Sequence, residues 1–302
     1  MAGANKLRVG FIGASGMMGH GMAKNILNKG HPLALTVHRN QDAVKDLLEA
    51  GATRAETPAA LAAVSDVIFI CVTGSPQVEQ QFDGPDGLLE GGRKGLYIVD
   101  CSTSEPDSTA RLREAAAAKG MILIDAPLAR TPVEAEEGRL NVILGASESD
   151  HQTLAPVLKT FAENVFHVGE AGSGHTVKLL NNFIAQAVCT AAAEAFAVGA
   201  KAGIDPKKLV DVVSAGGVNS GLFQAMGKTL SGDMQGIKFG LDNARKDVRY
   251  YTHLAEANNV PSVVGEAVHQ TLCLASALGY GGEYVPSLVR AQEKVTGVKL
   301  VP

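Results

Sequence analysis

A lysine and an asparagine just past the middle of the chain have the side chains and the spacing for proton transfer to a bound molecule. Lys178 and Asn182 are four residues apart, so a helix places both on one face. Val177 and Leu179 flank the lysine. Apolar surroundings favour the neutral form of an amine, which can then exchange a proton with a reacting oxygen. A lysine that extends its ammonium into solvent near a helix start is the alternative.

A second set of polar residues follows three predicted strands. The loops concerned are residues 72–75, 101–104 and 126–131. Because the carboxyl ends of parallel strands meet at the ligand-binding edge of an open sheet, we expect these loops to lie together. A ligand with an acid group needs hydroxyl donors and a cation, although loop hydroxyls also form turns and helix caps. The candidates for substrate binding are Ser102, Thr103, Arg130 and Thr131.

A glycine-rich turn links the first predicted strand, residues 7–13, to a helix beginning near Met17. The turn contains Gly13, Gly16 and Gly19. Two residues separate Gly13 from Gly16, one more than separates the first two glycines of the usual dinucleotide pattern. Glycine lets the backbone approach a pyrophosphate, and the helix N-terminus stabilises its charge. The turn therefore predicts a nicotinamide dinucleotide site. Its expected ligands are Gly13, Ser15, Gly16, Met17 and Met18, with Val72 and Thr73 from a neighbouring strand end.

The end of the second predicted strand, residues 33–38, indicates which dinucleotide binds. An acidic residue there would bind the ribose 2′-hydroxyl of NAD, whereas an arginine accommodates the 2′-phosphate of NADP. The chain has Arg39 and no Asp or Glu at this strand end. NADP is therefore the expected cofactor, with NAD as the alternative; an exposed arginine without a ligand is the other interpretation.

Composition favours a globular protein that binds small molecules. The 302 residues are 46% hydrophobic and 19% charged, with a net charge of -4. Lys and Arg form no stripe, so no nucleic-acid partner is expected. The apolar runs are short and interrupted, so no membrane partner is expected either.

Cysteines and histidines are dispersed along the chain. The four cysteines show no paired spacing, and few residues precede the first strand, which favours reduced thiols and a cytoplasmic location. The eight histidines are scattered without an evident metal-ligand spacing, so no metal site is expected.

In the first half of the chain, predicted strands alternate with predicted helices, and these elements position the residues named above. Strands are predicted at residues 7–13, 33–38, 66–72, 96–101, 121–125 and 141–145, and helices at 17–29, 42–50 and 106–119. Such alternation predicts a Rossmann-type, doubly wound parallel sheet in a cofactor domain of residues 1–170. Residues 171–302 are predicted to form an all-helical domain, joined through one long, mostly buried helix at 177–202.

Four sequence blocks together resemble the β-hydroxyacid dehydrogenase family. They are residues 9–13 with Met18 and Gly19, residues 100–103, residues 174–182, and Phe239 with Lys246 and Asp247. The family includes 3-hydroxyisobutyrate dehydrogenases, tartronate semialdehyde reductases, sulfolactaldehyde reductases and the glyoxylate and succinic semialdehyde reductases. The similarity covers essentially the whole chain, and the blocks occur in the family's order.

The resemblance implies a role for several residues. Lys178 would be the general acid and base, Asn182 would orient the substrate, and Ser102 would hold its acid group. Phe239 would pack near the nicotinamide, and Lys246 would reach the cofactor or the substrate. The resemblance also implies a homodimer or homotetramer.

One loop departs from many relatives, which have Ser-Gly-Gly after the proline that follows the strand at 121–125. Here Pro127 precedes Leu128, Ala129, Arg130 and Thr131, followed by Ala135, Gly138 and Leu140. This arrangement resembles the sulfolactaldehyde reductase branch, where the arginine contacts a sulfonate. A guanidinium binds carboxylate, sulfonate or phosphate, so the substrate's acid group stays open.

The expected function is interconversion of a small 3-hydroxy acid and its semialdehyde by hydride transfer with NADP(H) or NAD(H). A non-catalytic NADP-binding regulatory protein is one alternative. A decarboxylating sugar-acid dehydrogenase is another, although its helical domain is ordinarily much longer. Imine reductases share the architecture but generally replace the lysine found here at position 178.

Overall fold

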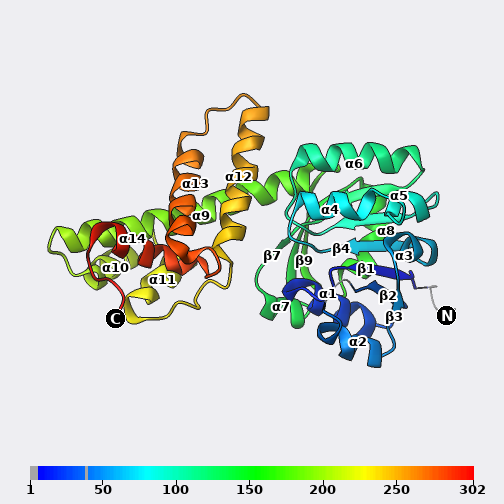
Figure 1. Ribbon diagram of the computed structural model, residues 1–302, viewed down its shortest axis with the longest axis horizontal. Helices are drawn as coiled ribbons and strands as arrows, with labels where there is room; N and C mark the ends of the chain where they lie inside the picture. Colours follow the sequence, from blue (N-terminus) through cyan, green and yellow to red (C-terminus); the bar gives the residue numbers. More distant parts are fainter. Residues whose placement is uncertain (1–5, 38–39) are drawn as a thin grey trace. The chain divides into compact units, whose positions relative to one another are not determined.

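The computed structural model describes residues 6–37 and 40–302. It divides into two compact units, Met1–Lys178 and Leu179–Pro302, which are described separately below. Figure 1 shows strands with covering helices in the first unit and helices in the second. The predicted boundary at residues 170–171 lies just before the long helix α9 (Ser173–Lys201).

The first unit is built on a mainly parallel sheet. Its first six strands are β1 (Val9–Ile12), β2 (Leu33–Thr36), β3 (Thr53–Ala55), β4 (Val67–Ile70), β5 (Tyr97–Asp100) and β6 (Ile122–Asp125). They lie in the order β3-β2-β1-β4-β5-β6, and all neighbours in this series are parallel. This strand order is that of the Rossmann fold and reverses direction between β1 and β4. The predicted fold class is therefore confirmed.

Helices cover both faces of this sheet. They are α1 (Met17–Asn28), α2 (Lys45–Glu49), α3 (Pro58–Val64), α4 (Ser75–Phe82), α5 (Leu88–Gly91), α6 (Pro106–Ala118), α7 (Pro132–Glu136) and α8 (Glu148–Leu158). Successive side chains of β1 point to opposite faces of the sheet. Phe11 packs in the core that includes α1 and α8, whereas Ile12 packs in the core that includes α3 to α6. Both faces of each central strand are buried, which explains why these strands are continuous apolar runs.

The sheet differs from the prediction at its last strands. β8 (Leu140–Gly145) was expected to be parallel but runs antiparallel to β6 and to β7 (Leu128–Ala129). β9 (Ala162–Gly169) pairs in parallel with β8. β3, β7 and β9 were not predicted, because β3 and β7 are very short and most β9 residues are exposed. An edge strand of that kind lacks the apolar run that reveals a buried strand.

The regular structure of the second unit's described residues is helical, apart from one isolated antiparallel β-bridge between Gly240 and Tyr284. α9 continues into it and is followed by α10 (Pro206–Ser214), α11 (Gly221–Lys228), α12 (Leu241–Ala257), α13 (Val263–Ala275) and α14 (Leu288–Thr296). Its core combines buried residues of α9, α11, α13 and α14, among them Phe196, Met226, Leu272 and Val289. Here too the predicted all-helical architecture is confirmed.

Helix α9 differs from two expectations of the sequence analysis, one about membrane-spanning segments and one about the burial of this helix. By length and composition it is apolar enough to cross a membrane, contrary to the expectation that no segment is, because its charged residues Lys178, Glu194 and Lys201 are widely spaced. A core helix passes the same test, and Phe196 and Ala193 of α9 are fully buried in the core. The helix is also less buried than expected: only 39% of its most apolar window is buried, and Ile184 and Val198 are both more than 60% exposed. The neighbouring elements therefore leave part of its apolar surface uncovered.

Candidate active site

The β1–α1 turn has a backbone suited to a phosphate group. Gly13 adopts φ +94°, and a Cβ there would lie 2.1 Å from the carbonyl oxygen of Cys71, so only glycine fits. A Cβ on Gly19 would lie 2.2 Å from the carbonyl oxygen of Gly13. Gly16 is the least crowded of the three, and as the exposed N-cap of α1 it places no side chain over the helix N-terminus. The first-turn N–H groups of α1 therefore remain open to an anion.

The other residues predicted to bind the cofactor are placed as follows. Ser15 and Met17 are exposed and Met18 is half-buried in the same turn. Val72 and Thr73 follow β4, the parallel neighbour of β1. Arg39 lies outside the described residues.

A hydrogen bond joins the loops that follow β4 and β5. Ser102 is 3% exposed, and its hydroxyl oxygen accepts from the N–H of Val72 at 3.0 Å. Asp100, which is also buried, accepts from the N–H of Ser102 and from the hydroxyl of Ser104, both at 2.8 Å. These bonds hold Ser102 and Thr103 beside a predicted cofactor loop, as the position of the strand ends suggested.

Cys101 in this loop is not a reactive thiol. The residue is 3% exposed. Burial raises the pKa of the Cys101 thiol well above its usual value, and nearby Cys71 acts in the same direction. The thiol therefore stays protonated, and the loop offers hydroxyls but no sulfur nucleophile.

A buried aspartate at the end of β6 fixes the start of α9. Asp125 is fully buried, and its carboxylate accepts from the backbone N–H groups of Gly172 and His175. The His175 ring lies between Thr109, with 2.8 Å from Oγ1 to Nδ1, and Asp100, with 3.6 Å from Oδ2 to Nε2. Lys178, which is half-buried, lies one turn further along α9. The sheet thereby sets the position of the helix turn that carries the predicted proton donor.

Arg130 and Thr131 lie in the turn between β7 and α7. Arg130 adopts φ +82°, a strained value for a non-glycine residue. Its guanidinium donates to the carbonyl of Arg139 and forms an ion pair with Glu163 on β9. The Arg130 side chain is 29% exposed, so solvent can still reach it. The structure therefore gives the predicted anion-binding arginine a carboxylate partner within the protein.

Thr131 is the N-cap of α7. Its hydroxyl accepts from the N–H of Val133, while Glu134 accepts from the N–H of Thr131 at 3.0 Å, which completes a capping box. The hydrogen bond from the Thr131 hydroxyl lowers the pKa of the Glu134 carboxyl. Capping thus accounts for the threonine, and its contact with a substrate stays a prediction.

In the helical unit, Asn182 belongs to a buried polar network. Its amide nitrogen donates to Asp247 at 2.6 Å, and Asn182 and Asp247 are 6% and 2% exposed. Lys246 pairs with the other oxygen of Asp247 at 3.0 Å, and its ammonium lies 5.0 Å from the centroid of the Tyr250 ring. The carboxylate therefore fixes the orientation of the Asn182 side chain. Phe239, predicted to lie near the nicotinamide, packs partly buried against the core of this unit.

The roles of three buried aspartates near the site, and one cluster of potential metal ligands, were not predicted from the sequence. The roles of Asp100 and Asp125 follow from their position as the last residues of buried strands, a signal that was available but not used. Asp247 was noted only through the resemblance, and its contact with Asn182 joins residues 65 apart in sequence. In addition, Glu148, His151 and His167 lie close together, whereas the histidines were expected to be ungrouped.

Both units match known protein families. Residues 8–169 match the family model described as the NAD binding domain of 6-phosphogluconate dehydrogenase, and residues 172–291 match the model described as NAD-binding of NADP-dependent 3-hydroxyisobutyrate dehydrogenase. The chain is 33% identical to a 2-(hydroxymethyl)glutarate dehydrogenase of Eubacterium barkeri, over 97% of each chain. The chain belongs to the β-hydroxyacid dehydrogenase family. The resemblance inferred from the four sequence blocks is thereby confirmed.

Two further relatives support the same assignment for this β-hydroxyacid dehydrogenase. A 2-hydroxy-3-oxopropionate reductase of Escherichia coli is 31% identical and is matched over 97% of this chain and 100% of its own. A solved 3-hydroxyisobutyrate dehydrogenase of Salmonella typhimurium has a TM-score of 0.80 and 30% identity, over 94% of this chain and 99% of its own. The protein is thus an NAD(P)-dependent hydroxyacid dehydrogenase or semialdehyde reductase. The matches do not support the regulatory-protein or sugar-acid alternatives.

Proposed function

We propose that this β-hydroxyacid dehydrogenase reduces a three- or four-carbon aldehyde with one acidic tail, and oxidises the matching 3-hydroxy acid in reverse. The observation that carries the proposal is the α9 face on which Lys178 and Asn182 are four residues apart, with Asn182 held by Asp247. Arg130 in place of the Ser-Gly-Gly run favours a substrate with an anionic group, for which we propose a carboxylate or a sulfonate.

Proton transfer in this proposal belongs to Lys178. When bound, the nicotinamide cofactor supplies or accepts the hydride. As hydride reaches the aldehyde carbon, the Lys178 ammonium donates a proton to the developing alkoxide; in the oxidative direction its amine takes that proton back. One hydrogen of the Asn182 amide is committed to Asp247, so the second can donate to a substrate oxygen.

The loops of the first unit would hold the acid group. We assign Ser102 and Thr103 after β5 and Arg130 and Thr131 after β7 to this task. The hydroxyl of buried Ser102 accepts from Val72, so its own hydrogen remains to be donated to a substrate oxygen. Arg130 would exchange its Glu163 partner for the substrate's anion or hold both.

A panel of aldehydes tests the proposed function directly. Semialdehydes with a carboxylate tail, a sulfonate tail and a neutral tail of similar size are offered with NADPH and with NADH, and cofactor absorbance is followed. We expect turnover of an acid-tailed aldehyde with kcat/KM about 30-fold or more above that of the neutral analogue, since a charge-assisted pair is lost with the neutral tail. Absence of turnover with every acid-tailed aldehyde, or equal values for acidic and neutral tails, contradicts the proposal.

Cofactor preference forms a separate prediction. We infer that Arg39 pairs with the 2′-phosphate, so NADPH should give a higher kcat/KM than NADH. Arg39→Asp should weaken NADPH binding and leave NADH binding nearly unchanged, because an anion would then face the phosphate. Binding of each dinucleotide is measured by fluorescence titration of the wild type and the variant. A wild-type preference for NADH overturns the assignment.

We also propose a homodimer or homotetramer located in the cytoplasm. The exposed apolar side chains of α9, among them Ile184 and Val198, support association through the helical unit, since a second chain would remove them from water. Free thiols at all four cysteines support a reducing compartment.

A further inference from the structure

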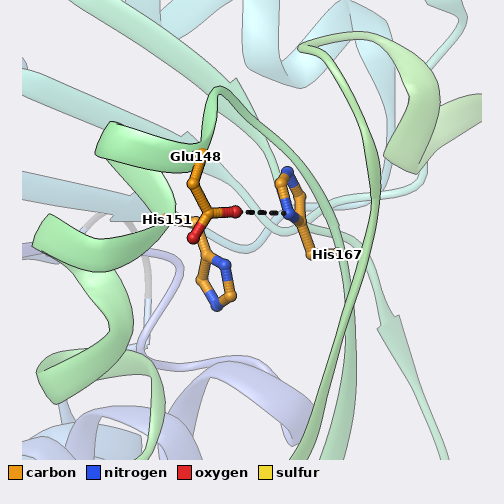
Figure 2. Close-up of side chains that lie close together, drawn as sticks. All are labelled: Glu148, His151 and His167. Atoms are coloured by element: carbon orange, nitrogen blue, oxygen red, sulfur yellow. Dashed lines mark ion pairs between the residues drawn. The ribbon is translucent and has the colours of Figure 1, made fainter.

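Three potential metal ligands lie together on the first unit, outside the residues assigned to cofactor or substrate. Glu148 and His151 are three residues apart in the first turn of α8, and His167 lies on β9. Each offers one ligand atom, and these atoms all lie within 4.8 Å of one another. Figure 2 shows the Glu148 carboxylate directed at the His167 ring, with the His151 ring beside it. Pairing of β8 with β9 brings the distant histidine to the helix.

The distances suit a small divalent ion. Glu148 Oε2 and His167 Nδ1 are 3.4 Å apart. Two ligands at about 2.0 Å from a tetrahedral zinc ion lie roughly 3.3 Å apart. The three ligand atoms lie within 4.8 Å of one another, so binding one ion would draw them together by up to about 1.5 Å, and the two exposed side chains, Glu148 and His167, have room to move.

A hydrogen bond to the backbone sets the tautomer of His167. Its Nε2 lies 2.6 Å from the carbonyl oxygen of Ala146, and because a carbonyl only accepts, Nε2 carries a hydrogen. In the neutral ring the lone pair of Nδ1 then faces the Glu148 carboxylate, a repulsive contact that either a proton on Nδ1 or a metal ion between the two atoms would make favourable. Metal-binding histidines commonly donate their second ring N–H to a carbonyl in this way.

His151 adds an unpaired nitrogen. Among the described side chains its Nδ1 is one of the few buried polar atoms without a hydrogen-bond partner. Its ring lies 4.9 Å from the ring of His167, centroid to centroid, at an angle of 49°. A buried nitrogen without a partner is costly, and a bound ion or its water would satisfy it.

We propose that Glu148, His151 and His167 bind one Zn²⁺ ion, which ties the start of α8 to β9. Two imidazoles and one carboxylate form a ligand set typical of zinc, with water at the fourth position. Mg²⁺ and Ca²⁺ favour all-oxygen sites, and a single carboxylate is a poor site for either. The Glu-x-x-His spacing in α8 was the sequence signal, but the third ligand appears only in the fold.

The competing interpretation is an ion pair between Glu148 and a protonated His167, with no metal. To separate the two, metal-free protein is titrated with Zn²⁺ and with Co²⁺, and bound metal per chain and the visible spectrum of Co²⁺ are recorded. We expect one ion per chain, four-coordinate Co²⁺ bands, and a Zn²⁺-dependent rise in the thermal midpoint that Mg²⁺ does not produce.

Variants assign the ligands. His151→Gln and His167→Gln should each weaken Zn²⁺ binding by at least about 10-fold and abolish the rise in the thermal midpoint. His253→Gln, which removes an exposed histidine of the helical unit, is the matched control and should bind as the wild type does. If a histidine variant unfolds, Glu148→Gln at an exposed position gives the same test. The proposal is overturned if the wild type binds no Zn²⁺, or if the ligand variants and the control bind it equally. Aldehyde reduction is not part of this readout, so the test stands apart from the proposed function.

Discussion

Lys178→Ala is expected to lower kcat for aldehyde reduction by at least about 100-fold while NADPH binding stays nearly intact. Loss of a general acid typically costs this much or more, because the alkoxide must then take its proton from water. The substitution changes no residue of the β1–α1 turn, where the cofactor is proposed to bind. Steady-state turnover and a dinucleotide titration on the same preparation separate loss of chemistry from loss of binding.

A second lysine on the same helix provides the control. Lys201 lies in the last turn of α9 and is exposed, so Lys201→Ala removes the same charge and keeps the same helix. Its kcat should match that of the wild type. Comparable turnover in Lys178→Ala and Lys201→Ala would show that Lys178 takes no part in proton transfer.

Arg130→Ala is expected to lower kcat/KM for acid-tailed aldehydes by roughly 30-fold, with little change for a neutral aldehyde of similar size. A 30-fold loss corresponds to about 2 kcal/mol, the low end for losing one partner of a charge-assisted pair. A surface arginine would cost much less. Because Arg130 also pairs with Glu163 and with the carbonyl of Arg139, its removal could instead loosen the turn between β7 and α7. That outcome would reduce activity on charged and neutral substrates equally.

Two variants decide between the two roles of Arg130. Arg139→Ala removes a neighbouring arginine that pairs with Glu137, and we expect no change in selectivity. Glu163→Gln frees the Arg130 guanidinium from its internal partner, so acid-tailed aldehydes should show a lower KM if the arginine binds the substrate. A Glu163→Gln variant with unchanged KM and lowered thermal stability assigns Arg130 to structure.

The parallel strands and the long helix could be predicted because their signals are local. β1, β4 and β5 are apolar runs buried on both faces, and α9 has no proline along its length. β9 could not be predicted in the same way, since it is an exposed edge strand that exists only through pairing with β8. The direction of β8 depends on the turn after β6, which sequence periodicity does not encode.

In the candidate site, too, features encoded by local sequence could be predicted, whereas contacts between distant residues could not. Glycine spacing identified the β1–α1 turn, and helix spacing placed Lys178 and Asn182 on one face. The contacts of Arg130 with Glu163, and of Asn182 with Asp247, join residues 33 and 65 apart, so they depend on tertiary structure. For Thr131 the capping box could have been recognised from Glu134 three residues later.

Chemical rescue of Lys178→Ala by small primary amines tests most directly whether Lys178 is the proton donor. In the oxidative direction, with NADP⁺ and the matching 3-hydroxy acid at saturation so that no added aldehyde can condense with the amine, the account predicts that the initial rate of the variant rises with the concentration of added alkylamine, because the amine replaces the base that takes the hydroxyl proton, the reverse of the donation in reduction. The wild type should not respond. A Lys178→Ala enzyme that binds NADP⁺ and substrate normally, yet shows no dependence on the amine or already turns over at the wild-type rate, would contradict the assignment of Lys178 as general acid and base.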